Sequence, residues 1–138
     1  MQAQYIMPAL TMIGLTFLVL LRIMQTRFPN FLSRKVHPQK VASRKDMALL
    51  IEDSRASDNF MNLFELPVLF YFLSLVILIF KIDSNFLLAL MWGFVFFRAI
   101  HSYIHCTYNK VIHRFYAFFM SCICLIAIFI TTVFKIIA

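Results

Sequence analysis

The sequence predicts an all-α membrane protein, folded as a bundle of four transmembrane helices. Three observations predict this fold class: 62% of the 138 residues are hydrophobic, only 14% are charged, and the hydrophobic residues fall into four long blocks. A soluble domain would have about 45–50% apolar and about 25% charged residues. A water-soluble globule is therefore excluded, and a membrane β-barrel is disfavoured because the blocks are continuously apolar and do not alternate.

Each block is long enough to cross a bilayer, because about 20 helical residues span its hydrocarbon core. The predicted spans are residues 5–24, 57–80, 85–107 and 111–134. They make up one membrane domain over residues 1–138, with one long connection at residues 25–56. We expect the first span to stay in the membrane, since no positive residue precedes it and it is too long for a cleaved signal peptide.

Local signals predict where the helices bend or end. In the long connection, Pro29 is expected to break the helix, and Ser43 followed by Asp46 resembles a capping box ahead of a short interfacial helix. Pro67 lies about ten residues into the second span, where it should kink the helix. The other two connections are only a few residues long, so consecutive spans should pack antiparallel.

The positive charge indicates how the bundle is oriented. All of the 13 Lys and Arg except Lys81, Arg98 and Lys135 lie in or near the connections between spans 1 and 2 and between spans 3 and 4. The positive-inside rule then places both connections in the cytoplasm and both termini outside. The net charge of +7 follows this topology and does not form a basic face on a soluble fold, so no nucleic-acid partner is predicted.

Polar side chains within the spans gather near the cytoplasmic ends. They are Arg22 in the first span, Arg55, Asp58, Asn62 and Glu65 in the second, Arg98, His101 and His105 in the third, and Arg114 in the fourth. Steps of three or four residues put the members of each span on one helical face. Ionisable groups are costly in a bilayer, and the outer half of the bundle is almost purely apolar, so we predict a pocket open at the cytoplasmic interface.

Two structural explanations stay open for these residues. Arg22, Arg55 and Arg114 lie near span ends, where they can anchor the helices to lipid phosphates. An ion pair from Glu65 to Arg98 or to Arg114 could serve folding alone.

A pocket of this composition suits a small zwitterion with a net negative charge, because Arg binds carboxylates and Glu receives an ammonium group. If the ligand carries a thiol, a nearby Arg favours the thiolate. His101 and His105 lie one turn apart but lack further ligands, so no metal is predicted. A bridged haem and a reactive Cys106 are weaker alternatives, and the three cysteines do not form a disulfide framework.

Two motifs resemble the MAPEG family, the membrane-associated proteins in eicosanoid and glutathione metabolism. Asn62-Leu-Phe-Glu65-Leu-Pro67 resembles the family's Asn-x-x-Glu signature with its following Pro. Arg98-x-x-His101-x-x-x-His105, with Arg114 nine residues later, has the spacing of the Arg, His, Tyr and catalytic Arg of the prostaglandin synthase branch. With the size, the four spans and the basic first connection, the resemblance covers nearly the whole chain.

The resemblance implies a homotrimer that holds glutathione, as co-substrate, between subunits in the cytoplasmic half. Arg114 would be the catalytic residue that stabilises the thiolate. The binding residues are expected to be Asn62, Glu65, Arg98, His101, His105, Arg55 and Arg22. The chain departs from the prostaglandin synthase branch in having His105 for Tyr, Phe115 for Ser and Phe118 for Tyr. In an alternative register, Arg55-x-x-x-Asn59 aligns with the signature, and Asn62 then stands at the position of its Glu.

Three functions follow from these residues. The first is a glutathione-dependent transferase or peroxidase acting on lipophilic electrophiles or hydroperoxides that arrive from the membrane lipid. The second is a non-catalytic MAPEG-like protein that binds lipid or aids assembly, and the third is a small multidrug-type transporter. A bacterial inner membrane and the endoplasmic reticulum are equally consistent with the sequence.

Overall fold

The chain folds into helices throughout its described part. The computed structural model describes residues 3–34 and 54–137, and these contain α1 (Ala3–Arg34), α3 (Arg55–Asn62), α4 (Leu66–Ile79), α5 (Asn85–Cys106) and α6 (Val111–Ile137), with no strand. Four stretches of this part are long and apolar enough to cross a membrane: Ala3–Thr26, Arg55–Ile79, Asn85–Cys106 and Val111–Ile137. The predicted fold class, an all-α bundle of four spans, is confirmed.

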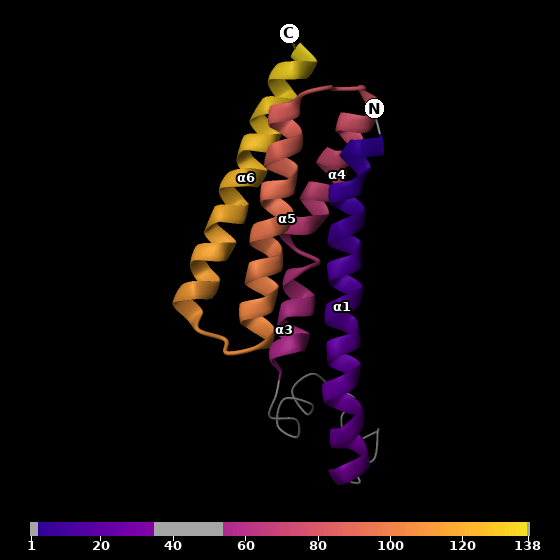
Figure 1. Ribbon diagram of the computed structural model, residues 1–138, viewed down its shortest axis with the longest axis vertical. Coiled ribbons are helices and arrows are strands. Elements are labelled where there is room, and N and C mark those ends of the chain that lie inside the picture. Colours follow the sequence, from indigo (N-terminus) through magenta and orange to yellow (C-terminus); the bar gives the residue numbers. More distant parts are fainter. Residues whose placement is uncertain (1–2, 35–53, 138) are drawn as a thin grey trace.

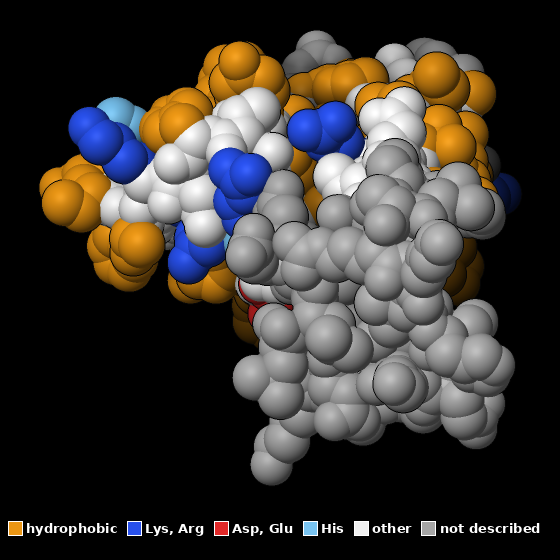
Figure 2. Space-filling model, turned by 90° about the horizontal axis from the view of Figure 1, so that it is seen from below, with side chains coloured by type: hydrophobic (Ala, Val, Ile, Leu, Met, Phe, Trp, Pro, Cys, Tyr) orange, Lys and Arg blue, Asp and Glu red, His pale blue; other side chains and the backbone are white. Residues whose placement is uncertain are grey.

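Successive spans run in opposite directions, so the described turns between them lie at opposite ends of the bundle. In Figure 1 both termini and the α4–α5 turn lie at one end, and the α5–α6 turn lies at the other, beside the start of α3. We call this second end the basic end, because Lys and Arg side chains stand out on it in Figure 2. The end of α1, the start of α3 and the α5–α6 turn therefore share one end, and the assignment of this end to the cytoplasm is a prediction.

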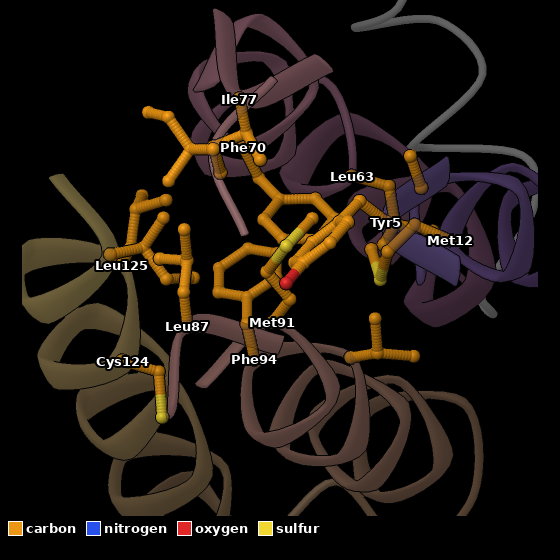
Figure 3. Close-up of a cluster of buried hydrophobic side chains, with 14 of the residues drawn as sticks. Tyr5, Met12, Leu63, Phe70, Ile77, Leu87, Met91, Phe94, Cys124 and Leu125 are labelled. Atoms are coloured by element: carbon orange, nitrogen blue, oxygen red, sulfur yellow. The ribbon is translucent and has the colours of Figure 1, made fainter. Parts of the chain in front are cut away.

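The core lies between α1, α4 and α5, with α6 packed against α5 (Figure 3). Phe70 on α4 stacks on Phe94 on α5, with ring centroids 4.4 Å apart, and Met12 and Met91 are fully buried beside them. Large apolar residues also cover the outside of the bundle, as the lipid-facing surface of a membrane protein requires.

A hydrogen-bonded contact closes the bundle at the end opposite the basic end. The Tyr5 hydroxyl on α1 donates to Asp83 Oδ1 at 2.8 Å and accepts from the Ser84 N–H at 2.6 Å. Both partners belong to the α4–α5 turn, where Lys81 adopts a left-handed φ of 53°. Tyr5 thereby ties the first helix to the turn between the second and third spans.

The second span is two helices and not the single kinked helix that the sequence predicted. α3 ends at Asn62, and α4 begins at Leu66 with Pro67 in its first turn. Pro has no N–H to donate to the preceding turn and fits best at the start of a helix. The chain therefore stops its helix before Pro67 and starts a new one there.

The first helix is longer than predicted. α1 continues through Pro29 to Arg34, so the expectation that Pro29 ends the helix is wrong. Pro29 removes one hydrogen bond of the helix, but its fixed φ is helical, so the turns on either side can continue. The capping box expected at Ser43 and Asp46 lies outside the described residues.

Candidate functional site

Arg114 lies in the first turn of α6 at the basic end, and two residues fix its guanidinium. Its Nη1 donates to Asn109 Oδ1 at 2.9 Å and lies 2.9 Å from His105 Nε2. Arginine can only donate hydrogen bonds, so His105 Nε2 must be the acceptor and carries no proton. The α5–α6 turn and the last turn of α5 therefore hold this cation in place before any ligand arrives.

His101 on α5 is oriented by the backbone of α6. Its Nδ1 lies 3.1 Å from the carbonyl oxygen of Arg114. Because a carbonyl can only accept, Nδ1 carries the proton, and in the neutral ring Nε2 is then an acceptor. The side chain is 4% exposed, and Nε2 has no hydrogen-bond partner among the described residues. His101 thus presents an unused acceptor beside Arg114.

Arg98 is fully buried on α5 and bridges to the break in the second span. Its Nη2 donates to the carbonyl oxygen of Asn62 at 2.7 Å. Asn62 is the last residue of α3, so its carbonyl lacks the regular hydrogen bond to an N–H of the next helical turn. Arg98 supplies a charged donor in its place. The guanidinium also lies 5.9 Å from the ring centroid of Phe118, and its Nε and Nη1 have no partner in the described part of the chain.

Residues of α3, α5 and α6 line an open cavity of about 210 Å³ at the basic end. It is lined by Asn62, His101, Val111, Arg114, Phe115 and Phe118. The cavity therefore combines three polar groups, those of Arg114, His101 and Asn62, with an apolar wall. The guanidinium attracts an anionic group, and the apolar wall accommodates a hydrocarbon part next to it. A thiolate bonded to a CH2 group has both features.

Five of the eight predicted site residues do not line this cavity. Arg98 and His105 hydrogen-bond to residues that do, Asn62 and Arg114, and the other three are Glu65, Arg55 and Arg22. Glu65 is exposed at the break before α4, and it forms no ion pair with Arg98 or Arg114 among the described residues. The break takes it off the helical face that it would have shared with Asn62. Arg55 donates from Nη1 to the Thr107 carbonyl at the end of α5, and Arg22 is exposed on α1.

The structure adds residues that the sequence did not assign to the site. Asn109 occupies the α5–α6 turn with a left-handed φ of 49°, a conformation that Asn tolerates well, and its side chain holds Arg114. Phe115 and Phe118, noted in the sequence only as departures from a family pattern, form the apolar wall. In the sequence, the short turn was the signal for Asn109, and the positions one and four residues after Arg114 were the signal for Phe115 and Phe118.

The fold and the site together define an integral, multi-pass membrane protein with a cationic cavity at one end of its bundle. The family model of the MAPEG family matches residues 5–134. The chain therefore belongs to the MAPEG family, as its motifs indicated. A comparison with curated proteins and one with solved structures each gave no match.

Proposed function

We propose that this protein is a glutathione-dependent transferase or peroxidase that acts on lipophilic electrophiles or hydroperoxides. The observation that carries the proposal is the cavity in which Arg114, His101 and Asn62 meet beside an apolar wall. Membership of the MAPEG family, whose proteins commonly use glutathione, supports it. In this proposal Arg114 stabilises the thiolate of glutathione, which attacks the second substrate.

The energy that this role requires is within reach of one arginine. A free thiol is only about 3% ionised at pH 7, and about 2.7 kcal/mol of stabilisation makes the thiolate the majority form. A charge-assisted hydrogen bond contributes about 1.5–3 kcal/mol when the donor is already in place. The bonds of the Arg114 guanidinium to His105 and Asn109 both use Nη1, which leaves Nε and Nη2 as donors for the sulfur.

We propose that the site is completed by neighbouring protomers in a homotrimer. The cavity of about 210 Å³ in one protomer is smaller than the about 300–1,000 Å³ usual for ligand sites. A second protomer would supply the missing wall, and the MAPEG family is typically trimeric. Glu65, Arg55 and Arg22 then act at the rim, where the carboxylate of Glu65 receives the ammonium group of glutathione and the two arginines its carboxylates.

The test compares the purified protein with Arg114→Ala. We expect the wild type to give the ultraviolet absorbance of a thiolate when glutathione is added, and to turn over an aryl halide or a lipid hydroperoxide. Arg114→Ala should lose the thiolate absorbance and at least about 100-fold in turnover, which corresponds to 2.7 kcal/mol. Lys110→Ala, which removes an exposed charge of the same end, serves as the matched control. Unchanged turnover in Arg114→Ala would remove Arg114 from this role.

A non-catalytic member of the family is the second candidate, and one observation favours it. His105 engages Arg114 at the position where the prostaglandin synthase branch has Tyr, so this position offers an acceptor and not a hydroxyl donor to the thiolate. If the wild type shows neither thiolate absorbance nor turnover of either substrate, the function is this second one.

A further inference from the structure

A group of polar side chains joins α3 to the last turns of α5, apart from the residues that line the cationic cavity. It consists of Asn59 on α3 and of Ser102 and Cys106 on α5. The Nδ2 group of Asn59 donates a hydrogen bond to Cys106 Sγ at 3.4 Å, so the two helices meet at this thiol. Ser102 and Cys106 are four residues apart, which puts their Cβ atoms about 5–6 Å apart on one face of α5.

Two members of this group are buried and have an unpaired polar atom. Asn59 is fully buried, and Ser102 is 2% exposed. Asn59 Oδ1 and Ser102 Oγ have no hydrogen-bond partner among the described residues. Because an unpaired polar atom is costly in the interior of a protein, these positions favour a group that both donates and accepts hydrogen bonds.

The surroundings of Cys106 differ from those of Cys122. Cys106 is half-buried, so a small reagent can reach it. The hydrogen bond from Asn59 favours the thiolate, the form of cysteine that reacts with peroxides. Arg55 brings a positive charge nearby, because its Nη1 donates to the carbonyl oxygen of Thr107, the next residue. Cys122 is also half-buried, but it lines an apolar groove in which every other side chain is a hydrocarbon.

We infer that Cys106 is a redox-sensitive site at which a hydroperoxide oxidises the thiol to a sulfenic acid, held by Asn59 and Ser102. The O–O bond of the hydroperoxide breaks, its terminal oxygen bonds to the sulfur, and the remainder leaves as an alcohol that takes up the thiol proton. The S–OH group then donates to Asn59 Oδ1 and accepts from the Ser102 hydroxyl, so both unpaired atoms gain a partner. Two molecules of glutathione return the sulfenic acid to the thiol and leave as a disulfide, with one water.

The inference does not depend on the proposed function, because it uses neither Arg114 nor the cationic cavity. A bound water molecule would also give the two unpaired atoms a partner, but Cys106 would then react no faster with a hydroperoxide than Cys122 does. The two cysteines of one molecule therefore provide the comparison that tests the inference.

Mass spectrometry of the full chain measures the oxidation of each cysteine. The purified protein in phosphatidylcholine vesicles is treated with tert-butyl hydroperoxide, which enters the bilayer and reaches both thiols, and then with dimedone, which bonds covalently to sulfenic acids. We expect at least about tenfold more dimedone on Cys106 than on Cys122, or 1.4 kcal/mol. Glutathione added before dimedone should prevent the labelling. Absence of label on Cys106, or equal labelling of the two cysteines, would overturn the inference.

Two substitutions test whether the unpaired atoms hold the oxidised sulfur. Ser102→Ala and Asn59→Leu should each shorten the lifetime of the sulfenic acid about tenfold, or 1.4 kcal/mol, when dimedone is added at increasing times after the peroxide is removed. Ser74→Ala is the matched control, because Ser74 is also 2% exposed but its hydroxyl already donates to the Phe70 carbonyl oxygen. Ser102→Ala keeps the Asn59 contact and decides the outcome if Asn59→Leu does not fold. An unchanged lifetime in Ser102→Ala, or an equal loss in Ser74→Ala, would overturn the inference.

Discussion

Replacing Arg98 with Met separates the structural contribution of this residue from its contribution to ligand binding. Arg98 is fully buried on α5, and its Nη2 bonds to the Asn62 carbonyl at 2.7 Å. Met has a similar length and no charge, so it fills the space and removes only the polar interactions. The change tests whether Arg98 is needed to hold the break between α3 and α4.

The stability terms of this substitution nearly cancel. Removing a hydrogen bond from a charged group costs about 1.5–3 kcal/mol. Losing the contact with the Phe118 ring costs about 0.5–2 kcal/mol. Taking an arginine out of the middle of a span, however, returns about 2.5–3.5 kcal/mol. We therefore expect the free energy of unfolding to change by less than about 2.5 kcal/mol.

Glutathione binding should change more than stability. Arg98 fixes Asn62, which lines the cationic cavity, and its own unpartnered donors lie beside that cavity. We expect the Kd for glutathione to rise at least about tenfold, equivalent to 1.4 kcal/mol. Titration with dodecyl sulfate in mixed micelles measures unfolding, and calorimetry measures binding. Lys110→Met, at an exposed position of the same end, should change neither quantity. A stability loss above about 3 kcal/mol with unchanged binding would show that Arg98 serves only the fold.

Three further substitutions test other contacts. His105→Phe removes the acceptor for Arg114 and should raise the glutathione Kd about tenfold by calorimetry, and an unchanged Kd would show that Asn109 alone positions the guanidinium. Tyr5→Phe removes both hydrogen bonds to the α4–α5 turn and should lower the free energy of unfolding by about 1–3 kcal/mol in mixed micelles while leaving glutathione binding intact. Asn62→Ala should weaken glutathione binding whereas Asn59→Ala, at a fully buried position, should reduce stability only, and the reverse result would support the alternative register of the signature.

The sequence predicted the spans well because length and hydropathy determine which segments can cross a bilayer. The predicted fourth span at residues 111–134 begins where α6 begins, at Val111, and the third begins with α5 at Asn85. The sequence also predicted that His101 and Arg114 would lie close together. This followed from their positions on either side of a short turn, which forces the ends of two antiparallel helices to meet.

The break in the second span could not be predicted from local sequence. Pro67 indicated a kink, whereas the structure has a full break, at which a donor from another helix, Arg98, reaches the Asn62 carbonyl. In a bilayer a backbone group freed from a helix must find a partner within the protein. The same break moves Glu65 to an exposed position, so Glu65 leaves the helical face predicted for it with Arg55, Asp58 and Asn62, and only these three share a face on α3.

The contacts of Arg114 bear on how the thiol would be activated. In the prostaglandin synthase branch that this chain resembles, a Tyr stands at the position of His105. Here Arg114 uses His105 Nε2 and Asn109 Oδ1 as acceptors, so both neighbours orient the cation and neither offers a hydroxyl. His101 Nε2 is likewise an acceptor. Stabilisation of a thiolate in the cationic cavity would therefore depend on the donors of Arg114, with Arg98 as a second cation that contacts two lining residues, Phe118 and Asn62. The choice between an enzyme and a non-catalytic member depends on whether those donors suffice.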